Sequence, residues 1–173
     1  MKWLLIGCLL GADVAARAGA FSLESAGARG GFSANKSGKD FNQAEAFLNA
    51  NLPWSPDLGR NWDLQTRLDL SIGWLGDRVA NAAISTLGPT LLLKQEGLPL
   101  SLEGGLSPTL LSQHDFETKD FGVKIQFTTH VGINWDFLGR FRLSYRFQHM
   151  SNARLSHHNP GLNLHMFGVS YLF

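Results

Sequence analysis

The chain has 173 residues, 44% of them hydrophobic, and its formal net charge at pH 7 is +1. A charge this close to zero gives no sign of a nucleic-acid partner or of an acidic substrate. A single cysteine excludes a disulfide-bonded scaffold, while 19 glycines and 12 phenylalanines favour β structure.

The first twenty residues are typical of a secretory signal peptide. A basic residue precedes an apolar stretch over residues 3–12, and the small residues Ala18 and Ala20 offer cleavage sites. We therefore expect residues 1–20 to be a signal peptide and residues 21–173 to form the mature domain. No later segment reaches the roughly 18 to 20 continuous apolar residues that a membrane-spanning helix requires.

The mature sequence alternates between apolar and polar residues with a period of two, and polar, glycine-rich turns interrupt this pattern. Such alternation predicts β-strands throughout. The eight predicted strands cover residues 22–34, 41–53, 61–75, 82–95, 98–111, 121–136, 139–151 and 162–173.

The predicted strands are long. A tilted transmembrane strand needs roughly 9–11 residues to cross the hydrocarbon core, whereas strands of soluble domains usually have about five or six. Short connections such as KQEGLP alternate with longer ones such as WLGDRVANA and LSQHDFETKD. We therefore expect an all-β fold, an eight-stranded antiparallel transmembrane β-barrel with short periplasmic turns and longer extracellular loops. Eight strands leave an interior filled by side chains, so an open porin channel is disfavoured.

The last two predicted strands show the pattern most clearly. Apolar side chains at alternate positions of residues 139–151 are separated by polar ones, among them Arg142 and Arg146. We expect these arginines to point inward and to pair with interior acids such as Asp69 or Glu103. The chain ends on a phenylalanine preceded by aromatic and apolar residues at alternate positions, which resembles the assembly signal of bacterial outer-membrane barrels. Alternation alone also fits a secreted β-sandwich or a lipocalin-like lipid-binding barrel.

Polar side chains gather where these two strands meet. His149 and Ser151 are two residues apart, so they share one strand face, and that face continues the apolar, lipid-facing positions. Asn163 falls on the same face of the next antiparallel strand, where opposed side chains lie about 5 Å apart. A serine nucleophile, a histidine base and a third group that orients the imidazole form a hydrolase triad.

These residues carry a resemblance to a known family. The stretch HMSNARL, followed by NPGLN and a last strand that ends in Phe, resembles the lipid A 3-O-deacylases, the PagL-type acyloxyacyl hydrolases of Gram-negative outer membranes. The resemblance implies an outer-membrane esterase that removes the 3-O-linked acyl chain of lipid A, needs no metal or other cofactor, and has its active site on the outer wall of the barrel. It implies Ser151 as nucleophile, His149 as general base and acid, and Asn152 as a candidate oxyanion donor.

One position departs from the family pattern. The family has a glutamate as the acidic member of the triad, and Asn163 stands there in this chain. Asparagine can accept a hydrogen bond from the imidazole, but it cannot offset the charge of an imidazolium. Another carboxylate can substitute, with Asp115, Glu117 and Asp120 in the preceding long loop as candidates. The alternative function is a weak or inactive small barrel with a structural or adhesive role.

The remaining expectations concern partners and supporting residues. Lipid A or lipopolysaccharide is the expected substrate, and outer-membrane lipid is expected to surround the barrel. A homodimer is a possible assembly. His157, His158 and His165 suggest a metal site less readily than they suggest solvated loop residues. Four tryptophans near predicted strand ends are expected to form interfacial girdles; they are Trp54, Trp62, Trp74 and Trp135.

Overall fold

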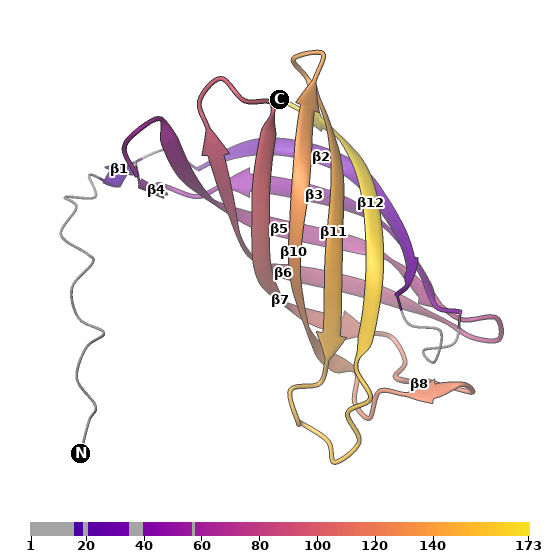
Figure 1. Ribbon diagram of the computed structural model, residues 1–173. Coiled ribbons are helices and arrows are strands. Elements are labelled where there is room, and N and C mark those ends of the chain that lie inside the picture. The colour runs from indigo at the N-terminus through magenta and orange to yellow at the C-terminus, as the bar shows by residue number, and fades with distance from the viewer. Residues whose placement is uncertain (1–15, 19–20, 35–39, 57) are drawn as a thin grey trace, which may run out of the picture.

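The computed structural model describes residues 16–18, 21–34, 40–56 and 58–173. Eight long antiparallel strands form a closed barrel in which each strand pairs with the next along the chain and the last pairs with the first (Figure 1). The barrel strands are β2 (Ser22–Ser33), β3 (Asn42–Asn51), β5 (Trp62–Gly76), β6 (Asn81–Gln95), β7 (Leu100–Leu111), β10 (Ile125–Phe137), β11 (Phe141–Ser151) and β12 (Leu162–Leu172).

The eight predicted strands and the predicted fold class are confirmed. The largest shift of a boundary is at the start of β10, where the chain over residues 121–124 turns before the strand begins and Gly122 adopts a left-handed φ of 81°. Among the described residues, two pairs of short strands lie outside the barrel. These are β1 (Ala16–Ala18) with β4 (Trp54–Pro56), and β8 (Asp115–Phe116) with β9 (Lys119–Asp120).

The predicted signal peptide lies largely outside the described residues. Only Ala16–Ala18 of that segment are described, as β1, so the cleavage and the mature boundary remain predictions. Among the residues that the structure describes, no helix is long and apolar enough to cross a bilayer.

The two ends of the barrel differ. The C terminus shares its end with the tight β6–β7 and β10–β11 turns, whereas the opposite end, here called the loop end, carries the long β7–β10 and β11–β12 loops (Figure 1). The β5–β6 connection at the loop end was predicted to be long and is instead a four-residue turn, Asp77–Ala80. The two strands pair as far as Gly76 and Asn81. In the turn, the Asp77 carboxylate accepts hydrogen bonds from the backbone N–H groups of Val79 and Ala80 at 2.9 and 2.8 Å.

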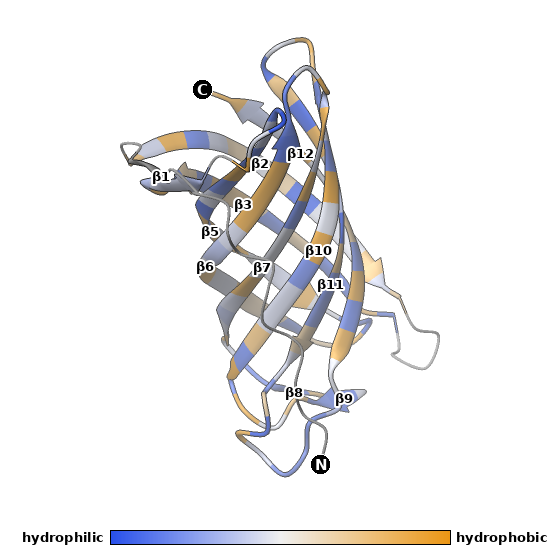
Figure 2. Ribbon diagram, turned by 60° about the vertical axis from the view of Figure 1, so that its left-hand side comes forward, coloured by the Kyte–Doolittle hydropathy of each residue, from blue (hydrophilic) through white to orange (hydrophobic). Residues whose placement is uncertain are grey.

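Apolar and polar residues alternate along the barrel strands (Figure 2). The exposed outer positions are mostly apolar, as a lipid-facing wall requires. They include Leu70, Ile72, Leu87, Leu91, Leu102, Leu106, Val131, Ile133, Phe167 and Val169. All four tryptophans expected in the girdles are exposed. Trp74 lies towards the loop end, while Trp62 and Trp135 lie near the other end.

The middle of the barrel interior is filled by charged side chains. Arg146 is 4% exposed and lies 3.2 Å from Glu45 and 3.7 Å from Asp69, while Arg142 lies 2.7 Å from Glu24. The predicted inward pairing of both arginines is confirmed, with Glu24 as an acid that the sequence did not single out. A cavity lined by Arg142, Arg146 and Asp69 among others has a volume of only about 10 Å³, as expected for an eight-stranded barrel whose interior is filled by side chains.

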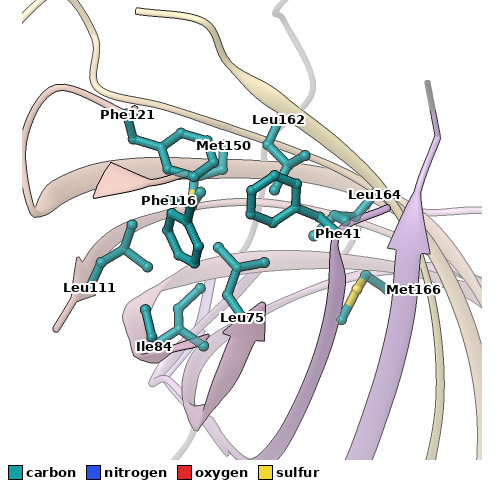
Figure 3. Packing of buried hydrophobic residues seen from close by; sticks show 11 residues of the cluster. Phe41, Leu75, Ile84, Leu111, Phe116, Phe121, Met150, Leu162, Leu164 and Met166 are labelled. Atoms are coloured by element: carbon teal, nitrogen blue, oxygen red, sulfur yellow. The ribbon is translucent and has the colours of Figure 1, made fainter. Parts of the chain in front are cut away.

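An apolar cluster closes the barrel at the loop end (Figure 3). The rings of Phe41, Phe116 and Phe121 contact one another edge to face, with centroids 5.2 to 5.7 Å apart. Met150 and Leu162, the inward neighbours of the predicted site residues, belong to the same cluster. The cluster therefore packs the β7–β10 loop against the strand ends that carry the site.

Candidate active site

The structure brings His149 and Asn163 together on the outer wall. They are directly opposed in the β11–β12 ladder, and His149 Nδ1 lies 2.6 Å from Asn163 Oδ1. Because an amide oxygen can only accept, Nδ1 carries the hydrogen and donates it. A neutral imidazole then has its other nitrogen, Nε2, unprotonated, which is the form that a general base requires.

Ser151 is the last residue of β11 and faces the same way as His149. It is half-buried, whereas His149 is exposed. The two Cα atoms are about 6–7 Å apart along the strand, and Ser151 Oγ makes no hydrogen bond to another described residue. Hydrogen bonds of catalytic groups are often long without substrate and tighten only when it binds. The serine is thus available beside the oriented imidazole.

Gly161 shapes the other side of the imidazole. Its φ is +56°, and a Cβ at this position would lie 3.0 Å from His149 Cε1. The absence of a side chain lets the chain that leads into β12 pass this close to the imidazole without a tight contact. The Gly161 carbonyl accepts a hydrogen bond from Lys119 Nζ. Burial lowers the pKa of the Lys119 ammonium, which also lies 5.6 Å from the centroid of the Phe121 ring.

Asn152 occupies a different place from the predicted one. Because Ser151 faces outward, the next residue faces inward, and Asn152 is fully buried. Its Nδ2 donates to the carbonyls of Phe121 at 2.9 Å and His158 at 2.7 Å, which uses both hydrogens. Its backbone N–H donates to Asn159 Oδ1 at 3.0 Å. The Asn152 side chain therefore joins the two long loops, and this geometry does not match the predicted role of oxyanion donor.

The three carboxylates considered as substitutes lie in the β7–β10 loop. Asp120 bonds to the Gly122 N–H at 2.7 Å and to His114 Nδ1 at 2.8 Å, and these two contacts lower the pKa of its carboxyl group. No ion pair joins His149 to Asp115, Glu117 or any other acid in the described ranges. Asn163 is thus the side-chain partner of the imidazole.

The histidines considered for a metal site do not cluster. The described part of the chain contains no group of three or more potential metal ligands. His157 and His158 are exposed in the β11–β12 loop, while His165 lies on the outer wall and contacts Tyr145.

Sequence reasoning missed Lys119 and Gly161. In the sequence Gly161 stands out only as part of the NPGLN stretch that carries the family resemblance, and its approach to His149, 12 residues earlier, appears only in the folded chain. Lys119 lies 42 residues away in sequence, so only the folded loops bring it to Gly161.

The chain matches known proteins over most of its length. The family described as Lipid A 3-O-deacylase (PagL) matches residues 42–172. The Lipid A deacylase PagL of Bordetella bronchiseptica (strain ATCC BAA-588 / NCTC 13252 / RB50) is 29% identical over 124 residues, which is 69% of this chain and 70% of that protein.

Solved structures share the fold. The crystal structure of the outer membrane enzyme PagL superposes with a TM-score of 0.68 at 17% identity and covers 87% of this chain and 98% of that one. The N-terminal β-barrel domain of Pseudomonas aeruginosa OprF gives a TM-score of 0.52 at 14% identity, covering 91% of this chain and 99% of that one. Because the family match spans well over half of the sequence, this chain belongs to the lipid A 3-O-deacylase (PagL) family.

Proposed function

We propose that this outer-membrane protein hydrolyses the 3-O-linked acyl chain of lipid A by serine catalysis. The observation that carries the proposal is the 2.6 Å contact between His149 Nδ1 and Asn163 Oδ1, placed beside Ser151 on the lipid-facing wall. Membership of the deacylase family supports the substrate class. With the loop end at the cell surface, these residues lie at the depth of the outer leaflet, where lipopolysaccharide resides.

The reaction has two steps. His149 Nε2 takes the hydroxyl proton of Ser151 as Oγ attacks the ester carbonyl, and the imidazolium returns a proton to the departing sugar oxygen. This step leaves an acyl-enzyme and a free 3-hydroxyl on lipid A. Water then attacks the acyl-enzyme with the same base, which releases a fatty acid and restores Ser151.

Asn163 supports this chemistry by orientation alone. Its amide oxygen holds the hydrogen on Nδ1 and so keeps Nε2 unprotonated, as an acceptor. It adds no charge to stabilise the imidazolium that forms in each step. We therefore expect a working but slower enzyme than one with a carboxylate here, rather than the inactive structural barrel.

The oxyanion needs donors other than the Asn152 amide, since both hydrogens of that amide are engaged. Asn159 is placed for this role because its Oδ1 accepts the N–H of Asn152, the residue next to the nucleophile. Its Nδ2 therefore lies near the end of β11 with two hydrogens to donate. A donor of this kind contributes about 10²–10³ in rate in well-studied hydrolases.

The test is mass spectrometry of lipid A incubated with the purified protein in detergent micelles. The wild type is expected to remove one acyl chain, and Ser151→Ala and His149→Ala are expected to leave the mass unchanged. Ser85→Ala is the matched control, because Ser85 faces outward on β6, away from the site. Deacylation by Ser151→Ala at the wild-type rate, or none by the wild type, would overturn the proposal.

A further inference from the structure

A hydrogen-bonded polar pair lies on the lipid-facing wall next to the proposed active site. Tyr145 Oη on β11 and His165 Nδ1 on β12 are 2.9 Å apart, and both residues are half-buried. His165 is the next outward residue after Asn163 on β12, in the direction away from the loop end. The catalytic chemistry described above uses neither side chain.

Aromatic rings surround this pair. The His165 ring lies 5.7 Å from the rings of Phe32 and Phe147 and 6.0 Å from that of Tyr145, and Phe167 lies 5.2 Å from Tyr145. We call these five residues the aromatic patch. A polar group on such a wall is costly unless it is hydrogen-bonded, and an ionisable residue that faces the membrane is therefore a candidate functional site.

The pair has one hydrogen to spare. A neutral histidine and a tyrosine together carry two donor hydrogens, and the bond between them uses one, whichever side chain donates. The described residues offer no acceptor to the other hydrogen. It remains on His165 Nε2 or on Tyr145 Oη, directed at whatever covers the aromatic patch.

The depth of the pair indicates what covers it. His165 lies two residues, about 6.6–6.8 Å along the strand, beyond Asn163, and a strand tilt of about 45° makes this roughly 5 Å of depth. If the scissile ester sits at Ser151 and His149, the groups a few ångströms deeper are the first carbons of the acyl chain. An oxygen substituent close to the carboxyl end of that chain would place an acceptor at the depth of the spare hydrogen.

We propose that Tyr145 and His165 form a specificity site that donates a hydrogen bond to an oxygen substituent near the carboxyl end of the substrate's acyl chain. The proposal rests on the deacylase function. It implies that the enzyme prefers a hydroxylated acyl ester to an unsubstituted one of equal length. One hydrogen bond of ordinary net strength corresponds to a preference of about five- to tenfold in kcat/KM.

The experiment compares two synthetic glucosamine 3-O-esters in detergent micelles, identical except for a hydroxyl on the third acyl carbon. The wild type is expected to favour the hydroxylated ester about five- to tenfold. The double variant Tyr145→Phe/His165→Phe removes both donors but keeps aromatic rings, and is expected to hydrolyse the two esters within about twofold of each other. Each single variant keeps one donor, which has lost its partner in the pair. Its preference for the hydroxylated ester should therefore lie between those of the wild type and the double variant.

Phe147→Leu is the control, because it changes the same aromatic patch without removing a hydrogen-bond donor. It should keep the wild-type preference for the hydroxylated ester. Retained heat-modifiable gel mobility checks that each variant has folded as a barrel. Equal rates of the wild type on both esters, or an unchanged preference in the double variant, would overturn the specificity site and leave the deacylase function intact. A wild type that hydrolyses neither ester would instead count against the deacylase function.

Discussion

His149 Nδ1 donates a hydrogen bond to Asn163 Oδ1 at 2.6 Å. The partner of the imidazole is therefore a neutral amide, although the proposed reaction turns this imidazole into a cation. Replacing the amide by a carboxylate keeps the acceptor and adds a negative charge. A charge-assisted hydrogen bond is roughly twice as strong as a neutral one, so we predict that Asn163→Glu raises kcat about tenfold. Initial rates of lipid A deacylation at saturating substrate measure this.

Asn163→Gln is the matched control for that variant, because it has the length of glutamate without the charge. It should show no gain, and a lower rate is expected if the longer amide fits poorly. A gain with both variants would mean that side-chain length matters rather than charge. No gain with Asn163→Glu would show that position 163 does not act as the acidic member of the triad.

Gly161 is predicted to be essential for the position of the imidazole. Alanine at this site must adopt a φ of +56° and place its Cβ 3.0 Å from His149 Cε1, so the ring must shift by a few tenths of an ångström. We expect Gly161→Ala to lower kcat about tenfold, since small displacements of a catalytic group are costly. Gly97→Ala is the control, because its φ is +81° and nothing lies within 4 Å of an added Cβ. Equal rate losses in the two variants would attribute the effect to backbone strain alone.

The strands and the outward face of the site were predictable for one physical reason. Strand side chains alternate strictly, so the lipid-facing apolar residues of β11 and β12 also fix where His149, Ser151 and Asn163 point. The same parity turns Asn152 inward, and the resemblance to a family motif had placed it at the reacting ester instead. Alternation thus predicts the inward side chain that the structure has at Asn152.

The loops were not predictable in the same way. The contacts among Phe41, Phe116 and Phe121 join segments far apart in sequence. Phe116 comes from a stretch predicted only as a long polar loop, whereas Phe41 and Phe121 stand at the first positions of two predicted strands. The alternation of apolar and polar residues does not predict these contacts, because they depend on which side chains fill the space at the loop end of the barrel. The bond from Lys119 to Gly161 depends on that packing, which is why neither residue was assigned to the site.

Lys119 is predicted to be a positioning residue that acts on His149 through Gly161. Lys119→Met removes the donor to the Gly161 carbonyl, and we expect kcat to fall several-fold with little change in KM. Lys119→Arg should recover part of the loss. Lys124→Met, in the same loop but exposed, is the control and should match the wild type.

A double-mutant cycle separates positioning from a general loss of order. If Lys119 acts through Gly161, the effects of Lys119→Met and Gly161→Ala on kcat should be less than additive, since residues in contact couple energetically. Additive effects, or a fall of thermal stability that parallels the fall of kcat, would contradict the positioning role.

Asn152 is predicted to contribute by holding the loops together. Asn152→Asp keeps the size of the side chain but loses both donors, to the Phe121 and His158 carbonyls, and sets a carboxylate against these oxygens. We expect the β7–β10 and β11–β12 loops to be cut faster in limited proteolysis. The rate of lipid A deacylation should fall as the rate of loop cleavage rises. Ser151→Ala should leave the proteolysis pattern unchanged. Loops that stay protected in Asn152→Asp while kcat drops by about 10² or more would instead favour a direct oxyanion contact by this residue.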